Sequence, residues 1–443
     1  MNQYKIYPKY KDSGVQWLGA IPENWLVTKV KYRAPYQVGW TPPTKVSENF
    51  EGENKWVTIG DLNSRIINTT KSCISDLAAK QASMNITPKG SLLFSFKLSV
   101  GTVAFAGANL YTNEAIASFL KNNDSNISYL YYASPLFIIQ NASENIYGAK
   151  ILNQELISNA TLVLPPLQEQ QTIANHLDNT TAKIDTLIEK QTKLIALLKE
   201  KRQAVISTAV TRGLDSSVPM KDSGIEWLGK IPKHWRLPQV SRILILMEQG
   251  KSPECDSSKA ELDEWGVLKT SCVNNAIYDS EKNKKLPSSI KPFTQYEVKE
   301  ENILMSRASG SIDLIGSVAY VYKTRAKILL SDKIFRLYVD NSVNKIFFTY
   351  LMASDYMRTN IKMAISGGEG MANNIAKSSI TRFKIALPPI EEQKIILIYI
   401  DKITTKIDNL ITKSTKAIDL LKEKRTALVS SAVTGKIDVR KAS

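Results

Sequence analysis

Two loops of the chain carry a long cationic side chain beside small, hydroxyl-bearing residues and glycine. One loop contains Lys97 and Ser99, and the other contains Arg307 and Ser309. Each follows a strand-like segment, so the two loops hold equivalent places in the chain. A loop of this kind can approach a DNA backbone closely and can present donors to guanine. We therefore predict that both loops contact DNA, with solvated turns as the alternative.

A second pair of polar loops precedes two long helical segments. Its candidate DNA-binding residues are Lys150, Asn153 and Gln154 in the first loop, and Asn373 and Asn374 in the second. Amide side chains suit the N6 and N7 edge of adenine. Lys251, within a Gly-Lys-Ser-Pro segment, completes the set of DNA-binding candidates.

The residue types needed for catalysis are sparse. The two histidines, His176 and His234, lie far apart in the sequence, and the three cysteines have no Cys-x-x-Cys spacing. This excludes a Ser-His-Asp triad and a His/Cys metal site. The odd number of cysteines also argues against a disulfide scaffold and favours reduced thiols. We predict a binding protein with no catalytic residues and no metal site.

The charge balance points to a polyanionic partner. The 443 residues include 58 lysines and arginines against 42 acidic residues, a net charge of +16. Nucleic acid is the commonest partner of so basic a chain, although ribosomal or membrane-surface contact stays open. The polar N-terminus lacks an apolar core, which predicts no secretory signal. The longest apolar run, residues 395–400, is too short to span a membrane. We expect a cytoplasmic, prokaryotic protein.

These candidate loops lie within a chain that is built twice from one plan. A long segment at 164–211 returns at 387–434, shifted by 223 residues without a gap. A short Trp-rich box at 11–25 returns at 221–235. Internal repeats of this kind define the architecture before any single element does. We predict that the four tryptophans of the boxes are packing residues: Trp17, Trp25, Trp227 and Trp235.

Both long segments have the heptad pattern of a coiled coil. One predicted seam row comprises Leu177, Ile184, Leu198 and Val205, and its counterpart comprises Ile400, Ile407, Leu421 and Leu428. A second predicted row contains Leu187, Leu194, Leu410 and Ala417. Polar Gln191 and Ser414 fall in the first row, where a polar residue can fix register. We expect the two helices to pair antiparallel about a local two-fold axis.

The fold class expected is mixed α/β (α+β), with two globular domains joined by two long antiparallel coiled-coil helices in pseudo-two-fold symmetry. Strands are expected near 91–96 and 334–339, and helices near 127–139 and 343–357. The predicted segments are box and globular domain 1 (1–162), central helix (163–214), box and globular domain 2 (215–385) and distal helix (386–443).

Several motifs of the double plan resemble the specificity (S) subunit of a Type I restriction-modification system. They are KDSGxxWLGxIPxxW before each variable region, LPPxxEQ at the start of each long segment and KEKRxAxxxxAVT near its end. A Gly-x-Thr/Ser-Pro pattern occurs at 39–42 and 250–253. A Gly-Asp-Leu motif occurs at 60–62, where the second copy departs with Thr270-Ser-Cys272. The resemblance covers essentially the whole chain.

The resemblance implies two target recognition domains, each reading one half of a split double-stranded DNA target. It implies that the helical pair sets the half-site spacing and docks two modification (methyltransferase) subunits. Restriction (translocase and nuclease) subunits would join them. S-adenosylmethionine, ATP and Mg would act in those partners, which methylate adenine at N6 and cleave DNA, and no cofactor would bind this chain. The alternative is a coiled-coil scaffold with two protein- or RNA-binding modules and no DNA specificity.

Overall fold

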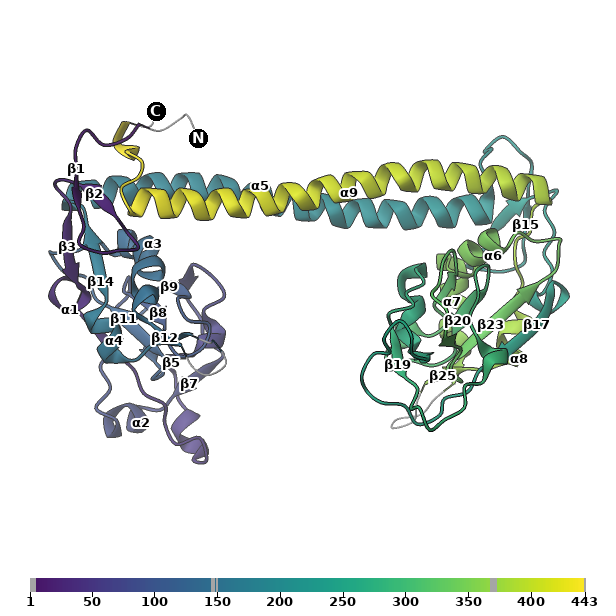
Figure 1. The fold of residues 1–443 in the computed structure, drawn as a ribbon, viewed down its shortest axis with the longest axis horizontal. Coiled ribbons are helices and arrows are strands. Elements are labelled where there is room, and N and C mark those ends of the chain that lie inside the picture. Colours follow the sequence, from purple (N-terminus) through teal and green to yellow (C-terminus); the bar gives the residue numbers. More distant parts are fainter. Residues whose placement is uncertain (1–4, 145–147, 149, 367–372, 442–443) are drawn as a thin grey trace. The chain divides into compact units, whose positions relative to one another are not determined.

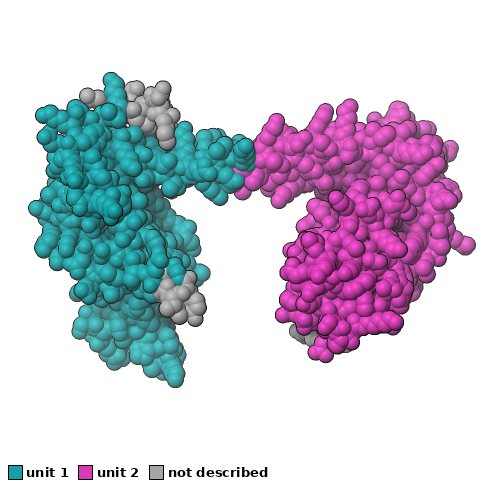
Figure 2. Space-filling view, in the orientation of Figure 1, with its two compact units in different colours: residues 1–191, 416–443 teal, residues 192–415 magenta. Residues whose placement is uncertain are grey.

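The computed structural model describes residues 5–144, 148, 150–366 and 373–441. The chain forms two compact units (Figures 1 and 2): unit 1 comprises residues 1–191 and 416–443, and unit 2 comprises 192–415. Each unit therefore contains one globular part and a portion of each long helix. The boundary between the compact units cuts through both long helices. The predicted segments instead kept each helix as a separate segment.

The globular part of unit 1 is built on a five-stranded sheet in the order β4-β11-β8-β9-β6. The strands are antiparallel except β6, which runs parallel to β9. Both β8 and β11 are fully buried, which agrees with the strand expected near 91–96. The bounds are β4 Tyr36–Val38, β6 Ile66–Ile67, β8 Leu92–Ser95, β9 Val103–Ala106 and β11 Ile116–Phe119. A smaller sheet, β10-β5-β7, has strands Tyr111–Thr112, Asn54–Val57 and Ser72–Ile74.

Helix α3 (Ile127–Phe137) covers the core of unit 1. Its buried Tyr129 and Phe137 belong to the same apolar cluster as Phe94 of β8. The remaining elements of this part are β1 Tyr10–Asp12, β2 Ala20–Pro22, β3 Leu26–Lys29, α1 Val30–Arg33, α2 Asp76–Gln81, β12 Ser143–Glu144, β13 Lys150–Ile151, α4 Gln154–Asn159 and β14 Thr161–Leu164.

Unit 2 uses an antiparallel four-stranded sheet, β17-β23-β20-β21, and a three-stranded sheet, β19-β18-β22. The strands are β17 Leu244–Gln249, β18 Gly266–Leu268, β19 Asn283–Lys285, β20 Ile303–Ser306, β21 Val318–Tyr320, β22 Ile328–Leu329 and β23 Ile334–Val339. The other elements are β15 Met220–Asp222, β16 Lys230–Pro232, β24 Ile365–Ser366, β25 Asn374–Ile375 and α8 Lys377–Arg382. The helix expected near 343–357 is wrong in extent. It divides into α6 (Lys345–Met352) and α7 (Asp355–Ala364), because the Ser354 hydroxyl caps α7.

The two long segments are the continuous helices α5 (Leu167–Arg212) and α9 (Ile390–Val433). Within unit 1, Leu177 early in α5 shares an apolar cluster with Leu428 late in α9. Within unit 2, Ile206 late in α5 shares a cluster with Ile400 early in α9. The helices therefore run antiparallel in each unit, as predicted. None of the described helices is long and apolar enough to cross a membrane.

The first predicted seam row is confirmed, whereas the second is wrong at its three leucines and has only Ala417 half-buried. Buried or half-buried positions include Leu177, Ile184, Gln191, Leu198, Val205, Ile400, Ile407, Ser414, Leu421 and Leu428. In contrast, Leu187, Leu194 and Leu410 are 46%, 42% and 50% exposed. Thr181 and its counterpart Thr404 are buried, and the second row continues from them every seven residues. Hydrophobicity favoured the leucines, but a coiled coil alternates spacings of three and four residues. The buried position is the one four residues after Leu177, Thr181, whose hydroxyl lies 3.2 Å from the Tyr132 hydroxyl of α3.

The Trp-rich boxes fasten each globular part to the start of a long helix. The indole Nε1 of buried Trp25 donates to Glu169 Oε1 at 3.0 Å, and Trp235 donates to Glu392 Oε1 at 3.0 Å. These contacts confirm packing roles for Trp25 and Trp235. Trp17 and Trp227 are 43% and 40% exposed. The Trp17 ring still packs on the buried Phe137 ring, with centroids 5.7 Å apart, and the Trp227 indole donates to Asn360 Oδ1 at 3.3 Å.

The glutamine of each LPPxxEQ motif also acts as a fastener. Gln170 Oε1 accepts from the Asn126 amide at 2.8 Å, and Gln393 Oε1 accepts from the Asn344 amide at 2.8 Å. Each glutamine amide group donates to a carbonyl of the Pro-Pro entry. Asn126 and Asn344 are the N-caps of α3 and α6, so the same contacts orient equivalent helices in both units.

Candidate nucleic-acid interface

The glycine of each Gly-x-Thr/Ser-Pro segment lies directly against the backbone of a neighbouring segment. A Cβ placed on Gly39 would lie 1.7 Å from the carbonyl oxygen of Thr112. A Cβ on Gly250 would lie 1.9 Å from that of Leu330. Any other residue would push the segment away from its neighbour, so glycine is required by space.

The hydroxyl of the same motif binds a carboxylate in both units. Thr41 Oγ1 donates to Glu114, and Ser252 Oγ donates to Asp332. In unit 1 the predicted DNA-binding residue Lys97 joins this pair, with its Nζ 3.6 Å from Glu114 Oε1. Burial raises the pKa of Glu114, but the hydrogen bond from Thr41 and the charge of Lys97 outweigh it, and the pKa lies below its ordinary value. Sequence reasoning missed both acids, because only the fold brings them to the motif.

In unit 2 the structure brings two of the predicted loops together. The Ile375 amide donates to the carbonyl oxygen of Arg307 at 3.0 Å, and Ala308 pairs with Asn374 in an antiparallel bridge. On its other side, the Arg307 amide donates to the carbonyl oxygen of Lys333 at 2.8 Å. The backbone of the Arg307 loop is thus held by two neighbouring segments. Its contact with DNA stays a prediction.

The corresponding residues of unit 1 are arranged differently. Lys150 lies on β13 and is exposed. Asn153 is the N-cap of α4, because its Oδ1 accepts from the Leu156 amide at 2.7 Å. Gln154 is exposed at the start of that helix. Among the described residues, no hydrogen bond or ion pair joins these three to Lys97 or Ser99. The cap explains why asparagine occurs here without requiring that it read adenine.

The remaining predicted residues occupy strained or partly covered positions. Ser99 has a positive φ of 48°, uncommon outside glycine. Ser309 Oγ accepts from the Ser311 amide at 3.3 Å. The Lys251 ammonium lies 4.7 Å from the centre of the Phe293 ring, a cation–π contact. Asn373 is half-buried and precedes β25.

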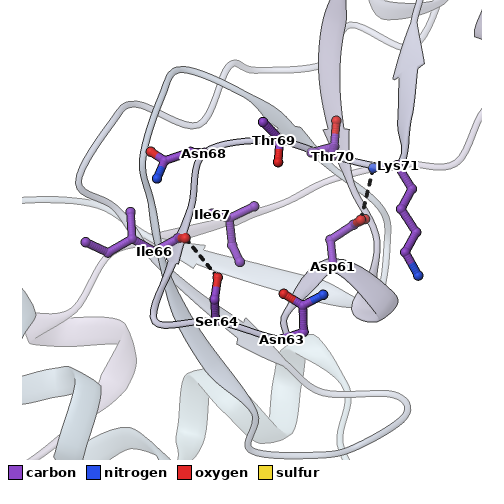
Figure 3. Close-up of a pocket in the computed structure, with 9 residues that line it drawn as sticks. All are labelled: Asp61, Asn63, Ser64, Ile66, Ile67, Asn68, Thr69, Thr70 and Lys71. Atoms are coloured by element: carbon purple, nitrogen blue, oxygen red, sulfur yellow. Dashed lines mark hydrogen bonds between the residues drawn. The ribbon is translucent and has the colours of Figure 1, made fainter. Parts of the chain in front are cut away.

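The Gly-Asp-Leu motif forms a short helical turn around a buried carboxylate. Asp61 Oδ2 accepts from the amide and the hydroxyl of Thr58 at 2.8 Å, and its Oδ1 accepts from the Lys71 amide at 3.1 Å. The turn forms one wall of an open cavity of about 380 Å³. Figure 3 shows the polar residues around this cavity, which sequence reasoning did not single out: Asn63, Ser64, Asn68, Thr69, Thr70 and Lys71.

The second copy replaces this carboxylate with an apolar contact. Cys272 lies in the short helix Thr270–Ala276 and is fully buried, and burial raises the pKa of its thiol well above the ordinary value. A neutral thiol cannot collect amide donors as Asp61 does. The turn of unit 2 therefore packs against an apolar cluster with Val273 and Leu304. The departure noted in the sequence is a real difference between the two globular parts.

Comparison with known proteins assigns the family. The model of the Type I restriction modification DNA specificity domain matches residues 22–197 and again residues 247–419. The chain belongs to this family. Both matches contain a globular part and most of a long helix, so the repeat seen in the sequence is a repeat of the family domain.

Relatives in the family include the Type I restriction enzyme EcoEI specificity subunit of Escherichia coli, 26% identical over 291 residues. That match covers 58% of this chain and 48% of the relative, so the chain spans about half the length of that protein. The putative MjaX specificity subunit of Methanocaldococcus jannaschii is 26% identical and matches over 96% of both chains.

A solved structure shares the fold. It comes from work on complex assembly and conformational transition of the type I restriction-modification system, and it superposes with a TM-score of 0.65. The superposition covers 93% of this chain and 98% of that chain at 16% sequence identity. This likeness confirms the predicted fold class of two globular parts joined by long helices.

Proposed function

We propose that this chain is the DNA-recognition subunit of a Type I restriction-modification complex, in which each globular part reads one half of a split target. The observation that carries this proposal is that the contacts between globular part and helix are the same in both units, whereas the surface turns differ. Trp25 and Trp235 bind equivalent glutamates at the same distance, while the turns at Asp61 and Cys272 differ in chemistry. A scaffold that is repeated but presents two different surfaces is suited to bind two different DNA half-sites.

The long helices have a surface suited to protein partners. Unit 2 exposes Leu194, Leu197 and Leu410. The counterparts in unit 1, shifted by 223 residues, include exposed Leu187 and Leu420. Exposed leucines clustered on a helix are typical of interaction sites. We propose that each set docks one methyltransferase subunit.

The flank of α5 that faces the globular part of unit 2 carries other residues. Gln203 Nε2 donates to the Ala353 carbonyl oxygen at 3.1 Å, and Ser207 Oγ accepts from the Asp355 amide at 3.1 Å. Because Leu194, Leu197 and Leu410 are 42–53% exposed, a partner could reach them without displacing the globular part.

The chemistry would reside in the partners. We propose that methyltransferase subunits bind S-adenosylmethionine and modify adenine at N6, and that restriction subunits use ATP and Mg to translocate and cleave DNA. This chain would bind no cofactor and would select the site in the cytoplasm of a prokaryotic cell. Its net charge of +16 supports contact with the phosphate backbone.

A domain exchange tests the proposal. Residues 26–162 would be replaced by the corresponding segment of another family member, and methylated adenines would be mapped in DNA treated with the assembled complex. We expect one half-site to change and the other to remain. A change in both halves would contradict independent reading, and a complex with no sequence preference would favour a protein- or RNA-binding scaffold.

An insertion tests the spacer role of the helices. Adding four residues, about one helical turn, next to Gln191 should lengthen the unread spacer between the half-sites. The same mapping of methylated adenines measures that spacer. An unchanged spacer would refute the role of the helices in setting it.

A further inference from the structure

Unit 2 contains a cavity of about 410 Å³ whose wall is rich in lysine and hydroxyl groups. Its cations are Lys269, Lys284 and Lys333, and its hydroxyls include Ser252 and Ser331. The segments that meet here are the Gly-x-Ser-Pro motif, the end of β18, strand β19 and the turn before β23. No sequence motif predicts the cavity, because its wall is formed by four segments that are separate in the sequence.

The lysines that line the cavity outnumber its acids. Across the described residues, Lys269, Lys284 and Lys333 form no ion pair. Nearby lysines do: Lys259 binds Glu281, and Lys285 Nζ lies 2.5 Å from Glu264 Oε1. Among the described residues that line the cavity, the only acid is Glu254. Three ammonium groups around one space favour the binding of an anion.

A buried hydroxyl in the wall lacks a partner. Ser331 is 3% exposed, and its Oγ has no hydrogen-bond partner in the part of the chain that the structure describes. Ser331 follows Leu330, which contacts Gly250, and Asn113 of unit 1 likewise follows Thr112, which contacts Gly39. The Asn113 side chain is paired, because its Oδ1 accepts from the Ala115 amide at 3.2 Å. Buried polar groups are almost always paired. An unpaired hydroxyl at the wall of a cationic cavity is therefore a donor available to a ligand.

The cavity adjoins the candidate nucleic-acid interface of unit 2. Ser252 of the cavity wall binds Asp332, and the Lys333 carbonyl accepts from the Arg307 amide at 2.8 Å. An anion held by Lys333 would therefore lie beside the Arg307 loop. Lysine and serine are common phosphate ligands in protein–DNA complexes, where phosphate contacts set the register and base contacts give specificity.

We infer that this lysine cavity holds a backbone phosphate of the DNA read by unit 2, and thereby fixes the register of the Arg307 loop. The inference rests on the proposed DNA-recognition function. It gives unit 2 an anchor that unit 1 builds differently, since the position equivalent to Lys333 is Ala115 in unit 1, beside Glu114 and its pair with Lys97.

The first test removes the charge. In the assembled complex, Lys269→Gln, Lys284→Gln and Lys333→Gln are combined, and binding to target and to random duplexes is measured across a salt series. We expect affinity for both duplexes to fall by about tenfold or more, and the salt slope to become shallower by roughly one for each phosphate that the variant no longer binds. The ratio of target to random binding should stay within about twofold. An unchanged salt slope would overturn the inference.

A matched control removes the same number of lysines that already have acidic partners: Lys259→Gln, Lys285→Gln and Lys345→Gln, the last from the pair with Glu301. We expect a smaller change in salt slope than with the cavity variant. An equal change would mean that general charge, rather than the cavity, binds the phosphate.

Ser331→Ala tests the hydroxyl without removing a charge. Because the hydroxyl has no described partner, the thermal midpoint should not fall, whereas DNA affinity should weaken several-fold. A lower midpoint with unchanged affinity would show that the hydroxyl serves the fold and would overturn its role as a phosphate donor.

Protection of a cysteine separates DNA phosphate from free phosphate. Cys255 lines the cavity, and burial raises the pKa of its thiol despite the neighbouring Lys284. In a Cys73→Ser background, alkylation by iodoacetamide above pH 8 is followed with the complex alone, with duplex, or with millimolar inorganic phosphate. Protection by duplex alone supports the inference, while protection by phosphate alone, or no protection when duplex is bound, overturns it. Loss of target preference in the unmodified complex would instead refute the proposed function.

Discussion

Units 1 and 2 differ least where the globular part meets the helix and most where the loops are free. Both units bind a buried tryptophan to a helix glutamate at 3.0 Å, and both tie a glutamine to the N-cap of a core helix at 2.8 Å. The turns differ instead in charge and polarity. Asp61 organises a polar cavity in unit 1, whereas a lysine-rich cavity and buried Cys272 occupy unit 2.

The difference shows which contacts the fold requires. Each of these tryptophan and glutamine contacts places a polar atom in a buried site, where the loss of its hydrogen-bond partner is costly. Neither residue of such a pair can therefore be substituted without destabilising its unit. A loop at the surface loses little when its side chains change. A duplicated chain can therefore keep one frame and acquire two binding surfaces.

The largest effect is expected at the tryptophan fasteners. Trp25→Ala and Trp235→Ala should each destabilise their own unit by about 3–5 kcal/mol, because each removes a fully buried indole. Far-UV circular dichroism during urea unfolding measures the loss. Trp17→Ala is the matched control, and its 43% exposure predicts a clearly smaller effect. Unequal losses at Trp25 and Trp235 would break the equivalence of the units.

Alanine at the entry glycines should have the next largest effect. Gly39→Ala and Gly250→Ala each place a Cβ against a carbonyl oxygen, and overpacking of this kind costs about 1–3 kcal/mol. Each variant should also weaken binding to its own half-site. Gly60→Ala and Gly310→Ala are suitable controls for the effect on stability, since a Cβ there meets nothing closer than 3.8 Å. Urea midpoints and gel shifts with half-site-mutated duplexes measure both effects, and loss of binding to both half-sites would contradict separate surfaces.

Acid should affect unit 1 through Glu114. A carboxyl whose pKa is lowered in the folded state adds stability above its ordinary pKa of 4.5, and that stability is lost as the pH falls through the folded pKa. The side chain is 45% exposed, so the contribution should be below about 1 kcal/mol. Thr41→Val removes the hydrogen bond and should flatten the loss of stability below pH 4.5 in urea titrations. An unchanged pH profile in this variant would show that the Thr41 bond does not stabilise the carboxylate.

The smallest effect is expected at the ion pairs between the helices. Arg202 Nε donates to both carboxylate oxygens of Asp408, at 3.0 and 3.3 Å. The equivalent Arg425 Nε lies 3.1 Å from Asp185 Oδ1 but lacks hydrogen-bond geometry. Double-mutant cycles with alanine should give about 0.2–1 kcal/mol for the first pair and less for the second. Equal coupling energies would mean that this difference in geometry has no energetic consequence.

Much of the fold could be predicted because its signals are local or repeated. The antiparallel pairing of the long helices follows from the duplication and heptads, and Ile334–Val339 forms the strand that its apolar run predicts. Leu187, Leu194 and Leu410 were misplaced because leucine is equally hydrophobic on either side of a seam. Asn153 was predicted as a DNA-binding candidate from its residue type alone, and only the fold shows that its side-chain oxygen caps α4.

The sequence by itself determined the double plan, the heptad helices, the lack of catalytic motifs and the two classes of loop, because periodicity and spacing are properties of the chain. Only the tertiary structure decided which second row of each helix is buried and which loops meet at Arg307 and Asn374. It also placed Glu114 and Asp332 on the entry motifs and joined three lysines around one cavity. These contacts join residues from distant segments. Hydrogen bonds and charge interactions depend on the distance between atoms in space, which the fold sets and the separation in sequence does not.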